Sequence, residues 1–549
     1  MNALVSIAVA VFACSAVCAE PCVVAEGENW VRFEHRNDIV PGSALDFSEM
    51  RLQDAPAGRH GWLKAKGGHF EFENLPGVEQ RFYGVNLCFS ANFPDRDLAD
   101  CVADRLVRCG YNTVRIHHYD GMWAKSEANR EKLDYFVAKC IERGIYITTD
   151  LYVSRPVKWQ RNAYKRMVGT NDVAFCDWAD FARSFLEHVN PHTGQAYKDE
   201  PAMPLISLVN EGGESRAVWE KCSAFVRALG AKALLTNDNH GTKHGDGEGL
   251  TTMYDYVDNH FYVDHPDFIG RQWQLPSRCD NKNPILTKKP WLFHVGYAKG
   301  ASKPYTITEW NFSGPGRYRG MGGLLTGAQA AEQEWDGLWR FAYSHSARDL
   351  ADVPEGAPGY FDCATDPLIA ASDRASVCLF LRRDVVAGSL RMDKAAGSMT
   401  LVSPRTCGGF AESGTIDAGP LSFTICTNAV AHRIVPTTLW VSSIDGKPVA
   451  ESSRMLLTHL TDVQGAGATF EDATRKVLLN WGKGCLVESG AAEVSLCINE
   501  PHCYHIWALA ANGARRFAVP CRVEKDILRF SVATRGVDGK GVMQYEITR

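Results

Sequence analysis

The sequence lacks several features that define well-known classes of protein. After residue 20 it has no apolar run of the roughly 18 residues that a membrane-spanning helix needs. It has no block of lysine and arginine, and its formal net charge is -5, so it gives no sign of the basic surface that nucleic-acid binding requires. There is no Cys-x-x-Cys pair or Cys/His group with zinc spacing, and no Gly-x-Ser-x-Gly elbow of a serine hydrolase. We therefore predict no membrane span, no nucleic-acid partner and no thiolate metal site.

The composition is that of an ordinary globular protein, with 45% hydrophobic and 22% charged residues. Its 549 residues exceed the size at which a single hydrophobic core stops growing, so several domains are expected. Residues 4–17 are small and apolar, and Val17-Cys18-Ala19 fits a signal-peptidase site. Residues 1–19 are thus predicted to be a signal peptide of an exported protein. Lipid attachment at Cys14 or Cys18 is the alternative.

Cysteine is common, with eighteen residues in the chain. Six of them lie between Cys407 and Cys521, and in an exported protein these could form up to three disulfides. Others, such as Cys101 and Cys140, fall on predicted helices, where a buried free thiol acts as a small hydrophobic residue. The sequence leaves both states of the cysteines open.

The order of predicted elements divides the chain into three parts. Residues 20–80 are β-rich, with a hairpin at Gly67-Gly68, and are expected to cover one end of the next domain. From residue 81 to 384, apolar strands alternate with amphipathic helices, which is typical of a parallel sheet; eight such units predict a (β/α)₈ TIM barrel. Residues 385–549 contain only short strands separated by turns, which predicts an all-β sandwich that braces the barrel. The eight predicted barrel strands are 82–88, 112–116, 145–150, 205–209, 232–236, 256–262, 304–311 and 338–343.

Two of these strands have a glutamate at or near the end. Asn210-Glu211 comes after the fourth strand, and Glu309 ends the apolar run of the seventh. In such a barrel the site lies at the carboxyl ends of the strands, so the two acids should face each other across one bowl. Cleavage of a glycosidic bond needs one acid to protonate the leaving oxygen and a carboxylate to attack or to activate water. A single strand-end glutamate more often faces solvent, but the pair predicts a glycoside-cleaving site.

The motifs Asn210-Glu211 and Thr308-Glu309, about a hundred residues apart, resemble clan A of the glycoside hydrolases, most closely cellulase family 5. The resemblance implies a retaining enzyme for β-linked glycans (β-glucan, β-mannan or β-galactoside) that needs no cofactor or metal. It also implies that Glu211 is the acid/base, that Glu309 is the nucleophile and that Asn210 donates to the sugar 2-hydroxyl. The two carboxyl groups of such enzymes lie about 5 Å apart.

Other strand ends supply candidates for substrate binding. By the same resemblance, Arg115 would orient the nucleophile, and Tyr262, in His260-Phe261-Tyr262, would contact it. The remaining candidates are His117, Asn86 and Asp150 at strand ends, and Trp310 and Trp339, which we expect to line the cleft. The clan's tryptophan ends the eighth strand, whereas here Tyr343 or His345 would have to replace it.

Three alternatives remain. A metal-dependent hydrolase would use His117, His118, Asp150 and His260, but adjacent residues on a strand point to opposite faces, which disfavours one ion bound by both His117 and His118. A barrel of the same fold that only binds glycan is the second. The insertion at 264–303 would, as a third possibility, wall off the cleft and make the enzyme exo-acting.

Overall fold

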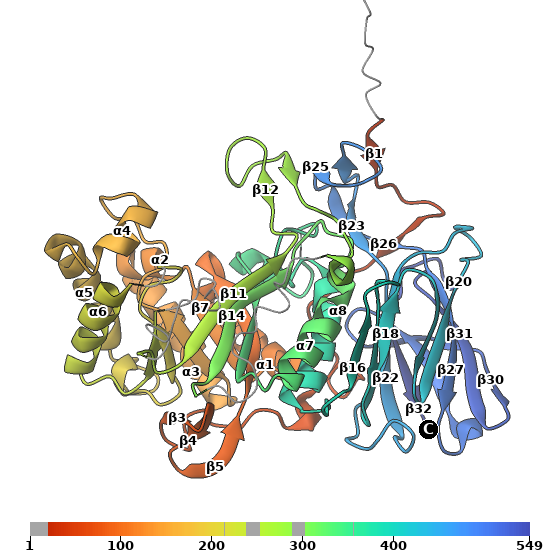
Figure 1. Cartoon of the computed structure of the whole chain (residues 1–549), viewed down its shortest axis with the longest axis horizontal. Helices are drawn as coiled ribbons and strands as arrows, with labels where there is room; N and C mark the ends of the chain where they lie inside the picture. Colours follow the sequence, from red (N-terminus) through yellow and green to blue (C-terminus); the bar gives the residue numbers. More distant parts are fainter. Residues whose placement is uncertain (1–19, 213–214, 238–252, 288–301, 355) are drawn as a thin grey trace, which may run out of the picture.

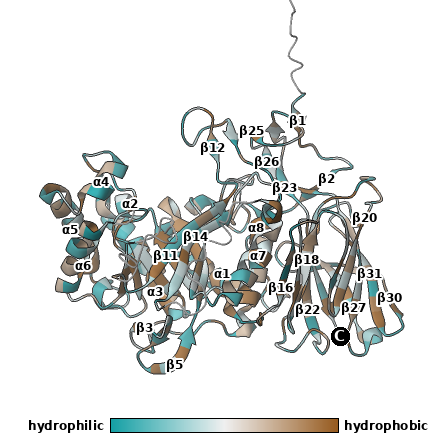
Figure 2. Cartoon of the chain, viewed as in Figure 1, coloured by the Kyte–Doolittle hydropathy of each residue, from teal (hydrophilic) through white to brown (hydrophobic). Residues whose placement is uncertain are grey.

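The computed structural model describes residues 20–212, 215–237, 253–287, 302–354 and 356–549. The expected signal peptide, residues 1–19, and part of the insertion, residues 288–301, lie outside the described residues. Figure 1 shows the barrel on the left of the view and the antiparallel sheets on the right, with helices α7 and α8 between them. Both parts contain hydrophobic strands in Figure 2.

Eight parallel strands form the barrel sheet, in the order β10-β9-β8-β7-β6-β15-β14-β11. Every residue of β6, β7, β8, β14 and β15 is buried, as expected for a parallel sheet covered on both faces. The predicted (β/α)₈ barrel is therefore confirmed. Its strands are β6 (Phe82–Cys88), β7 (Thr113–His117), β8 (Tyr146–Asp150), β9 (Leu205–Ser207), β10 (Leu234–Thr236), β11 (Val257–Val263), β14 (Tyr305–Phe312) and β15 (Gly337–Ser344).

The crossover helices begin at side chains that satisfy free backbone amides. Ser126 accepts a hydrogen bond from the first turn of α3, as Asn171 does for α5 and Asp366 for α8. Gly110, with a φ of 87°, ends α1 in the left-handed conformation that glycine adopts most easily. The helices are α1 (Arg96–Cys109), α2 (Asp120–Lys125), α3 (Glu127–Glu142), α4 (Arg161–Met167), α5 (Asp172–Leu186), α6 (Arg216–Ala228), α7 (Gly322–Glu332) and α8 (Pro367–Ser376).

A small antiparallel sheet covers the end of the barrel where the strands begin. It consists of β3 (Leu63–Lys66), β4 (His69–Phe72) and β5 (Leu75–Gln80). Phe70 and Phe72 pack in one apolar cluster with residues at the starts of barrel strands. The cover therefore closes the end of the barrel opposite to the carboxyl ends of its strands.

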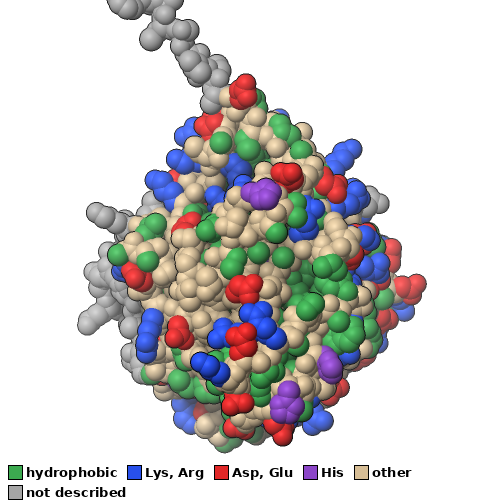
Figure 3. Space-filling model, turned by 90° about the vertical axis from the view of Figure 1, so that its right-hand side faces the viewer, with side chains coloured by type: hydrophobic (Ala, Val, Ile, Leu, Met, Phe, Trp, Pro, Cys, Tyr) green, Lys and Arg blue, Asp and Glu red, His purple; other side chains and the backbone are tan. Residues whose placement is uncertain are grey.

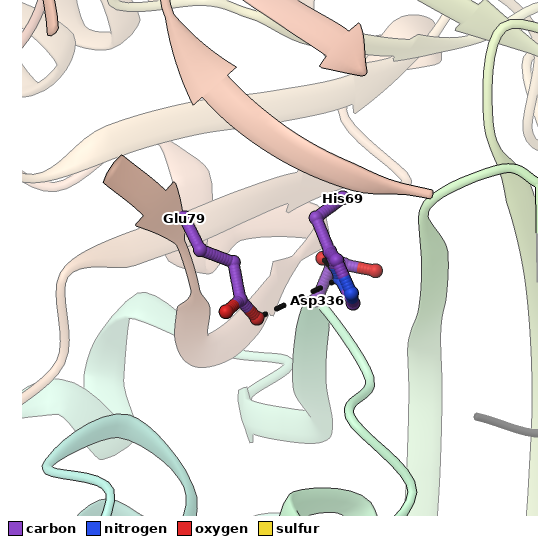
Figure 4. A group of neighbouring side chains, drawn as sticks. All are labelled: His69, Glu79 and Asp336. Atoms are coloured by element: carbon purple, nitrogen blue, oxygen red, sulfur yellow. Dashed lines mark hydrogen bonds and ion pairs between the residues drawn. The ribbon is translucent and has the colours of Figure 1, made fainter. Parts of the chain in front are cut away.

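A cluster of charged side chains joins this cover to the barrel (Figure 4). Nδ1 of His69 lies 2.9 Å from Oδ1 of Asp336, just before β15, and 3.6 Å from Oε1 of Glu79. Ligand atoms of these three residues lie within 4.8 Å of one another, a spacing that could hold a cation. However, Arg383 already pairs with Glu79, and the backbone amide of Tyr305 donates to Asp336. We interpret the cluster as an ion-pair clamp between cover and barrel.

Two antiparallel sheets form the C-terminal sandwich. The first has the order β16-β17-β18-β21-β22-β32-β28-β29 and the second the order β19-β20-β27-β31-β30. Alternate residues of β22 serve two cores: Leu456 and Leu460 pack in the barrel cluster, whereas Met455 and Leu457 pack between the two sheets. The strands are β16 (Leu390–Asp393), β17 (Ser398–Val402), β18 (Thr406–Ala411), β19 (Gly414–Ala418), β20 (Leu421–Cys426), β21 (Thr437–Ser443), β22 (Arg454–Leu460), β27 (Ala491–Cys497), β28 (His505–Leu509), β29 (Arg515–Val519), β30 (Cys521–Glu524), β31 (Ile527–Ala533) and β32 (Gln544–Thr548).

Two further sheets combine strands from distant parts of the chain. The N-terminal β1 (Cys22–Val23) pairs with β24 (Thr469–Phe470), and β2 (Trp30–Phe33) pairs with β26 (Lys483–Glu488), which also pairs with β23 (Val463–Ala466). From the barrel insertion, β12 (Asp267–Phe268) and β13 (Ser277–Arg278) join the same sheet as β1 through β25 (Val477–Asn480). Residues 20–80 are thus shared: β3–β5 cover the barrel, whereas β1 and β2 belong to sheets of the C-terminal part.

The sixteen cysteines that lie within the described residues are all free thiols. In the same residues, no helix is both long and apolar enough to cross a bilayer. The face of the molecule seen in Figure 3 carries acidic and basic side chains scattered among hydrophobic ones, without a patch of one sign.

Candidate active site

A cavity of about 700 Å³ opens at the carboxyl ends of the barrel strands. Glu211 and Glu309 both line it, as do Asn210, His117 and Tyr262. Five of the eleven predicted site residues therefore meet in one pocket. The rest of the wall comes from β15, from loops after the strands, from α4 and from the insertion: Phe89, His118, Val153, Arg161, Asn162, Lys165, His265, Gln272, Trp273, Phe341, His345, Gly359, Tyr360, Phe361, Asp362 and Thr365.

Glu309 lies within β14 and is almost completely buried, with 4% of its surface exposed. Nη1 of Arg115 donates to its Oε1 at 2.8 Å, and the hydroxyl of Tyr262 donates to its Oε2 at 2.7 Å. Nε2 of His117 lies 3.2 Å from Oε1. Three side chains from two other strands thus fix both oxygens of this carboxylate.

The surroundings keep Glu309 ionised. Burial opposes its ionisation, but the positive charges of His260 and Arg115 outweigh that effect and lower its pKa below the usual 4.5. For His117, burial and the neighbouring Arg115 lower the pKa well below 6.5, so we take this imidazole as neutral. The permanent cation beside Glu309 is therefore Arg115.

Glu211 has a different environment. It lies four residues beyond the end of β9, in the left-handed conformation with φ 48°, and its side chain is 38% exposed. One oxygen of Glu211, one of Glu309 and a nitrogen of His260 all lie within 4.8 Å of one another. The two carboxyl groups therefore face each other at close range, one buried and held, the other open to the pocket.

His260 connects the two acids. Its Nδ1 lies 3.2 Å from Oε1 of Glu211 and 3.5 Å from Oε2 of Glu309, and its Nε2 lies 3.1 Å from the hydroxyl of Thr308. Burial lowers the pKa of this imidazole, but the two carboxylates outweigh burial and raise it above 6.5. Glu211, Glu309 and His260 are also the residues here that could hold a cation. The Arg115 guanidinium already supplies a positive charge at Glu309.

A buried layer beneath the pocket holds Arg115 in place. Its Nη2 donates to Asp150 at 2.7 Å and to Oδ1 of Asn210 at 3.1 Å, and its Nη1 donates to Oδ1 of Asn86 at 3.0 Å. Asp150 also accepts from Nδ1 of His117 at 2.9 Å. Asn86 and Asp150 are fully buried and belong to this layer, outside the pocket lining. Their positions at strand ends had led us to expect contact with the substrate.

The structure corrects the expectation for Trp310 and Trp339, which both lie outside the pocket. Trp310 follows Glu309 on β14, and successive residues of a strand point to opposite faces, so its ring is directed away from the pocket, against Arg340 and Phe261. Trp339 is the third residue of β15 and packs in the cluster at the opposite end of the barrel. Being fully buried, neither indole can contact a sugar.

Other aromatic side chains form the wall instead. Phe341, further along β15, lies edge-on to His117 and to Tyr262. His345 also lines the pocket, but Tyr343 is buried beside Arg105 in a different cavity. Of the two replacements suggested for the clan's tryptophan, only His345 therefore reaches the pocket. Phe341 was missed although it stands at the same strand end.

The insertion adds Trp273, which no sequence pattern had marked as a site residue. Its side chain lines the pocket and is 55% exposed, an uncommon state for so large an apolar group. Phe89, which is 41% exposed, stacks on His118 with ring centroids 4.5 Å apart. Exposed rings on a pocket wall suit the apolar faces of sugars.

The rings of His117 and His118 both line the pocket, with centroids 4.4 Å apart. The expected separation to opposite faces fails because β7 ends at His117 and His118 has a φ of 51°. Nδ1 of His117 faces Asp150, and Nδ1 of His118 lies 2.8 Å from the hydroxyl of Ser154. Within the described chain, the metal-compatible groups do not include either ring.

No family model and no curated protein matches the sequence. Among solved structures, the endo-β-1,4-mannanase from Thermotoga petrophila is 15% identical and covers 70% of this chain and 98% of its own, with a TM-score of 0.45. The endo-1,4-β-mannanase from Rhizomucor miehei is 13% identical, covers 59% and 100%, and has a TM-score of 0.44. A glycoside hydrolase family 5 protein from Bacteroides vulgatus is 12% identical, covers 79% and 95%, and has a TM-score of 0.43. Likeness of this degree concerns the path of the chain and not its chemistry.

Proposed function

We propose that this protein is a retaining glycoside hydrolase for β-linked glycans, with Glu309 as the nucleophile and Glu211 as the acid/base. The observation that carries the proposal is the short distance between the two carboxyl groups, whose oxygens lie within 4.8 Å of each other. Retaining enzymes place their two carboxyl groups about 5 Å apart, whereas inverting enzymes leave about 6.5 Å or more for a water molecule. The β-linked substrate class is what the resemblance of the Asn210-Glu211 and Thr308-Glu309 motifs to clan A implies.

The two environments support the two roles. A nucleophile must be ionised and aimed, and Glu309 is held by Arg115 and Tyr262 with its pKa below the usual value. An acid/base must exchange protons with the leaving group and with water, and Glu211 is the more exposed of the two. Pairs of acids in unlike surroundings are the usual way to divide such roles.

The reaction then has two displacements. An oxygen of Glu309 forms a bond to the anomeric carbon while the glycosidic bond breaks and Glu211 gives its proton to the leaving oxygen. In the second step Glu211 takes a proton from water, whose oxygen bonds to the anomeric carbon and releases Glu309. The sugar product keeps its original anomeric configuration.

The proposal is tested with Glu309→Gln and Glu211→Gln proteins and an aryl-glycoside and polysaccharide panel. Each variant should lose most of its turnover while keeping the fold, and NMR of the first product formed by the wild type should show retention. Inversion, or wild-type turnover in either Gln variant, would overturn the assignment. Binding without hydrolysis across the panel would favour a glycan-binding barrel.

Azide separates the two acids from each other. With an aryl glycoside that has a good leaving group, added azide should restore turnover in Glu211→Ala, because a small anionic nucleophile needs no general base to attack the glycosyl-enzyme. The product should be the glycosyl azide with the same anomeric configuration as the substrate. An inverted azide product from Glu211→Ala would instead make Glu211 the nucleophile.

A further inference from the structure

Helix α4 brings two basic side chains to the pocket wall. Arg161 and Lys165 are four positions apart, so they lie on the same face of the helix, and both line the pocket together with Asn162. Lys165 is only 6% exposed. Among the described residues, its ammonium group has no hydrogen bond or ion pair within 4 Å.

A lysine that is almost completely buried and opens only into a pocket is unusual, because loss of hydration disfavours its charge unless an anion replaces the water. Burial lowers the pKa of Lys165, and Glu211 and Glu309 oppose that effect only in part. Arg161 is exposed and lies near enough to His118 to lower the pKa of that imidazole further. The wall at α4 therefore holds two cationic groups that the described residues do not neutralise.

The other charges of the pocket are already matched. Glu309 pairs with Arg115, Asp362 pairs with His345, and Glu211 is next to His260. Lys165 and Arg161, both on the α4 side, are thus the lysine and arginine side chains of the pocket lining, and neither pairs with a carboxylate among the described residues. A neutral sugar would leave this charge unmatched, whereas a carboxylate or sulfate would accept hydrogen bonds from both side chains.

We propose that the pocket binds a glycan with an anionic substituent, a uronate carboxylate or a sulfate ester, and that Lys165 and Arg161 bind this group. The inference rests on the proposed function for the sugar itself, and it narrows the substrate to acidic β-linked glycans. The buried Lys165 contacts the anionic group deep in the pocket, and the exposed Arg161 contacts it from the pocket entrance. Asn162 lies beside them and donates to a neighbouring hydroxyl group.

The test uses pairs of polysaccharides that differ only in charge: uronate polymers with their carboxyl-reduced forms, and sulfated polymers with their desulfated forms. Binding is measured with the Glu309→Gln protein, which leaves the polymers intact, and kcat/KM with the wild type. Lys165→Met and Arg161→Gln are compared with Arg166→Gln, an exposed charge on α4 outside the pocket lining. A preference for the anionic member within the uronate pairs would identify a carboxylate as the bound group, and one within the sulfated pairs would identify a sulfate.

We expect the anionic member of at least one pair to bind about tenfold or more tightly, in line with a charge-assisted hydrogen bond, and the preference to weaken with salt. Lys165→Met should abolish the preference and spare the neutral member, and Arg166→Gln should change neither. Equal or better binding of neutral members, or no binding of any member, overturns the inference. The inference is also overturned if Lys165→Met weakens binding of the anionic and the neutral member equally, because Lys165 would then act through Glu211. Charge-selective, Lys165-dependent binding without any hydrolysis would refute the proposed function but keep this site.

Discussion

The guanidinium of Arg115 joins the candidate nucleophile to the buried layer: its Nη1 lies 2.8 Å from Oε1 of Glu309. The same group donates to Asp150 through Nη2. A flat, forked guanidinium holds two carboxylates in fixed directions, whereas an ammonium group is a compact charge on a flexible stem. Glu309 is therefore held in a position that depends on β7 and β8 as well as on its own strand.

Arg115→Lys should keep the charge but lose one of the two contacts. We expect kcat/KM to fall by about 10- to 100-fold, the value of one charge-assisted hydrogen bond. The acid limb of the kcat/KM profile, which in the wild type lies below pH 4.5 because the pKa of Glu309 is lowered, should move to higher pH. Arg105→Lys alters another buried arginine, away from the pocket, and should leave this limb in place. An unmoved limb in Arg115→Lys would contradict the role of Arg115.

Tyr262→Phe removes the hydroxyl that donates to Oε2 of Glu309. The ionised carboxylate loses a stabilising donor, so its pKa should rise and kcat should fall by about 10- to 100-fold. The matched control is Tyr360→Phe, since Tyr360 lines the same pocket and, within the described residues, makes no hydrogen bond to either acid. Similar losses in both variants would show that the effect is one of packing.

Trp273→Ala tests whether the exposed ring of the insertion binds sugar. Loss of one stacking surface should raise KM by about 3- to 10-fold and leave kcat nearly unchanged, because the ring does not touch the reacting groups. Trp159→Ala, outside the pocket lining, should not affect KM. A change in kcat alone would mean that the insertion acts on the chemistry and not on binding.

His459 gives a prediction about stability. It is fully buried in the sandwich, neither ring nitrogen has a partner among the described residues, and burial lowers its pKa from 6.5 to about 3. Between pH 6.5 and about pH 3, His459 is protonated in the unfolded chain but neutral in the folded chain. The free energy of unfolding should therefore fall as the pH is lowered through this window, by up to ~1.4 kcal/mol per pH unit. His459→Leu should remove this slope and stabilise the protein at pH 7 by about 1–3 kcal/mol. Urea titrations at several pH values measure both effects, with the exposed His505→Gln as control.

The eight barrel strands could be predicted because buried parallel strands appear as short apolar runs between helical patterns. The meeting of Glu211 and Glu309 in one pocket could be predicted because a barrel gathers the carboxyl ends of its strands around one bowl. The same rules place Trp310 on the opposite face of its strand from Glu309, and Trp339 near the start of its strand. We nevertheless expected both side chains in the cleft, because sugars stack on aromatic rings. Strand position decides which aromatic residues reach the pocket.

The shared sheets could not be predicted from sequence. β12 and β13 have two residues each, too few for a periodic pattern, and Ser277 pairs with Leu478 across about two hundred residues of chain. Trp273, on the loop between them, and Lys165, on a seven-residue helix, reach the pocket only because of such tertiary arrangements. Loops that form a wall carry little local signal of the site they enclose.

The most direct test of Glu309 as the nucleophile is to trap the covalent intermediate. The wild-type protein is incubated with an activated 2-deoxy-2-fluoro glycoside of a sugar that it hydrolyses, digested and analysed by mass spectrometry. We predict inactivation with one added sugar per chain, located on Glu309 and absent from Glu309→Gln. A label on Glu211 or any other residue, or turnover with inversion and no trapped sugar, would contradict this assignment.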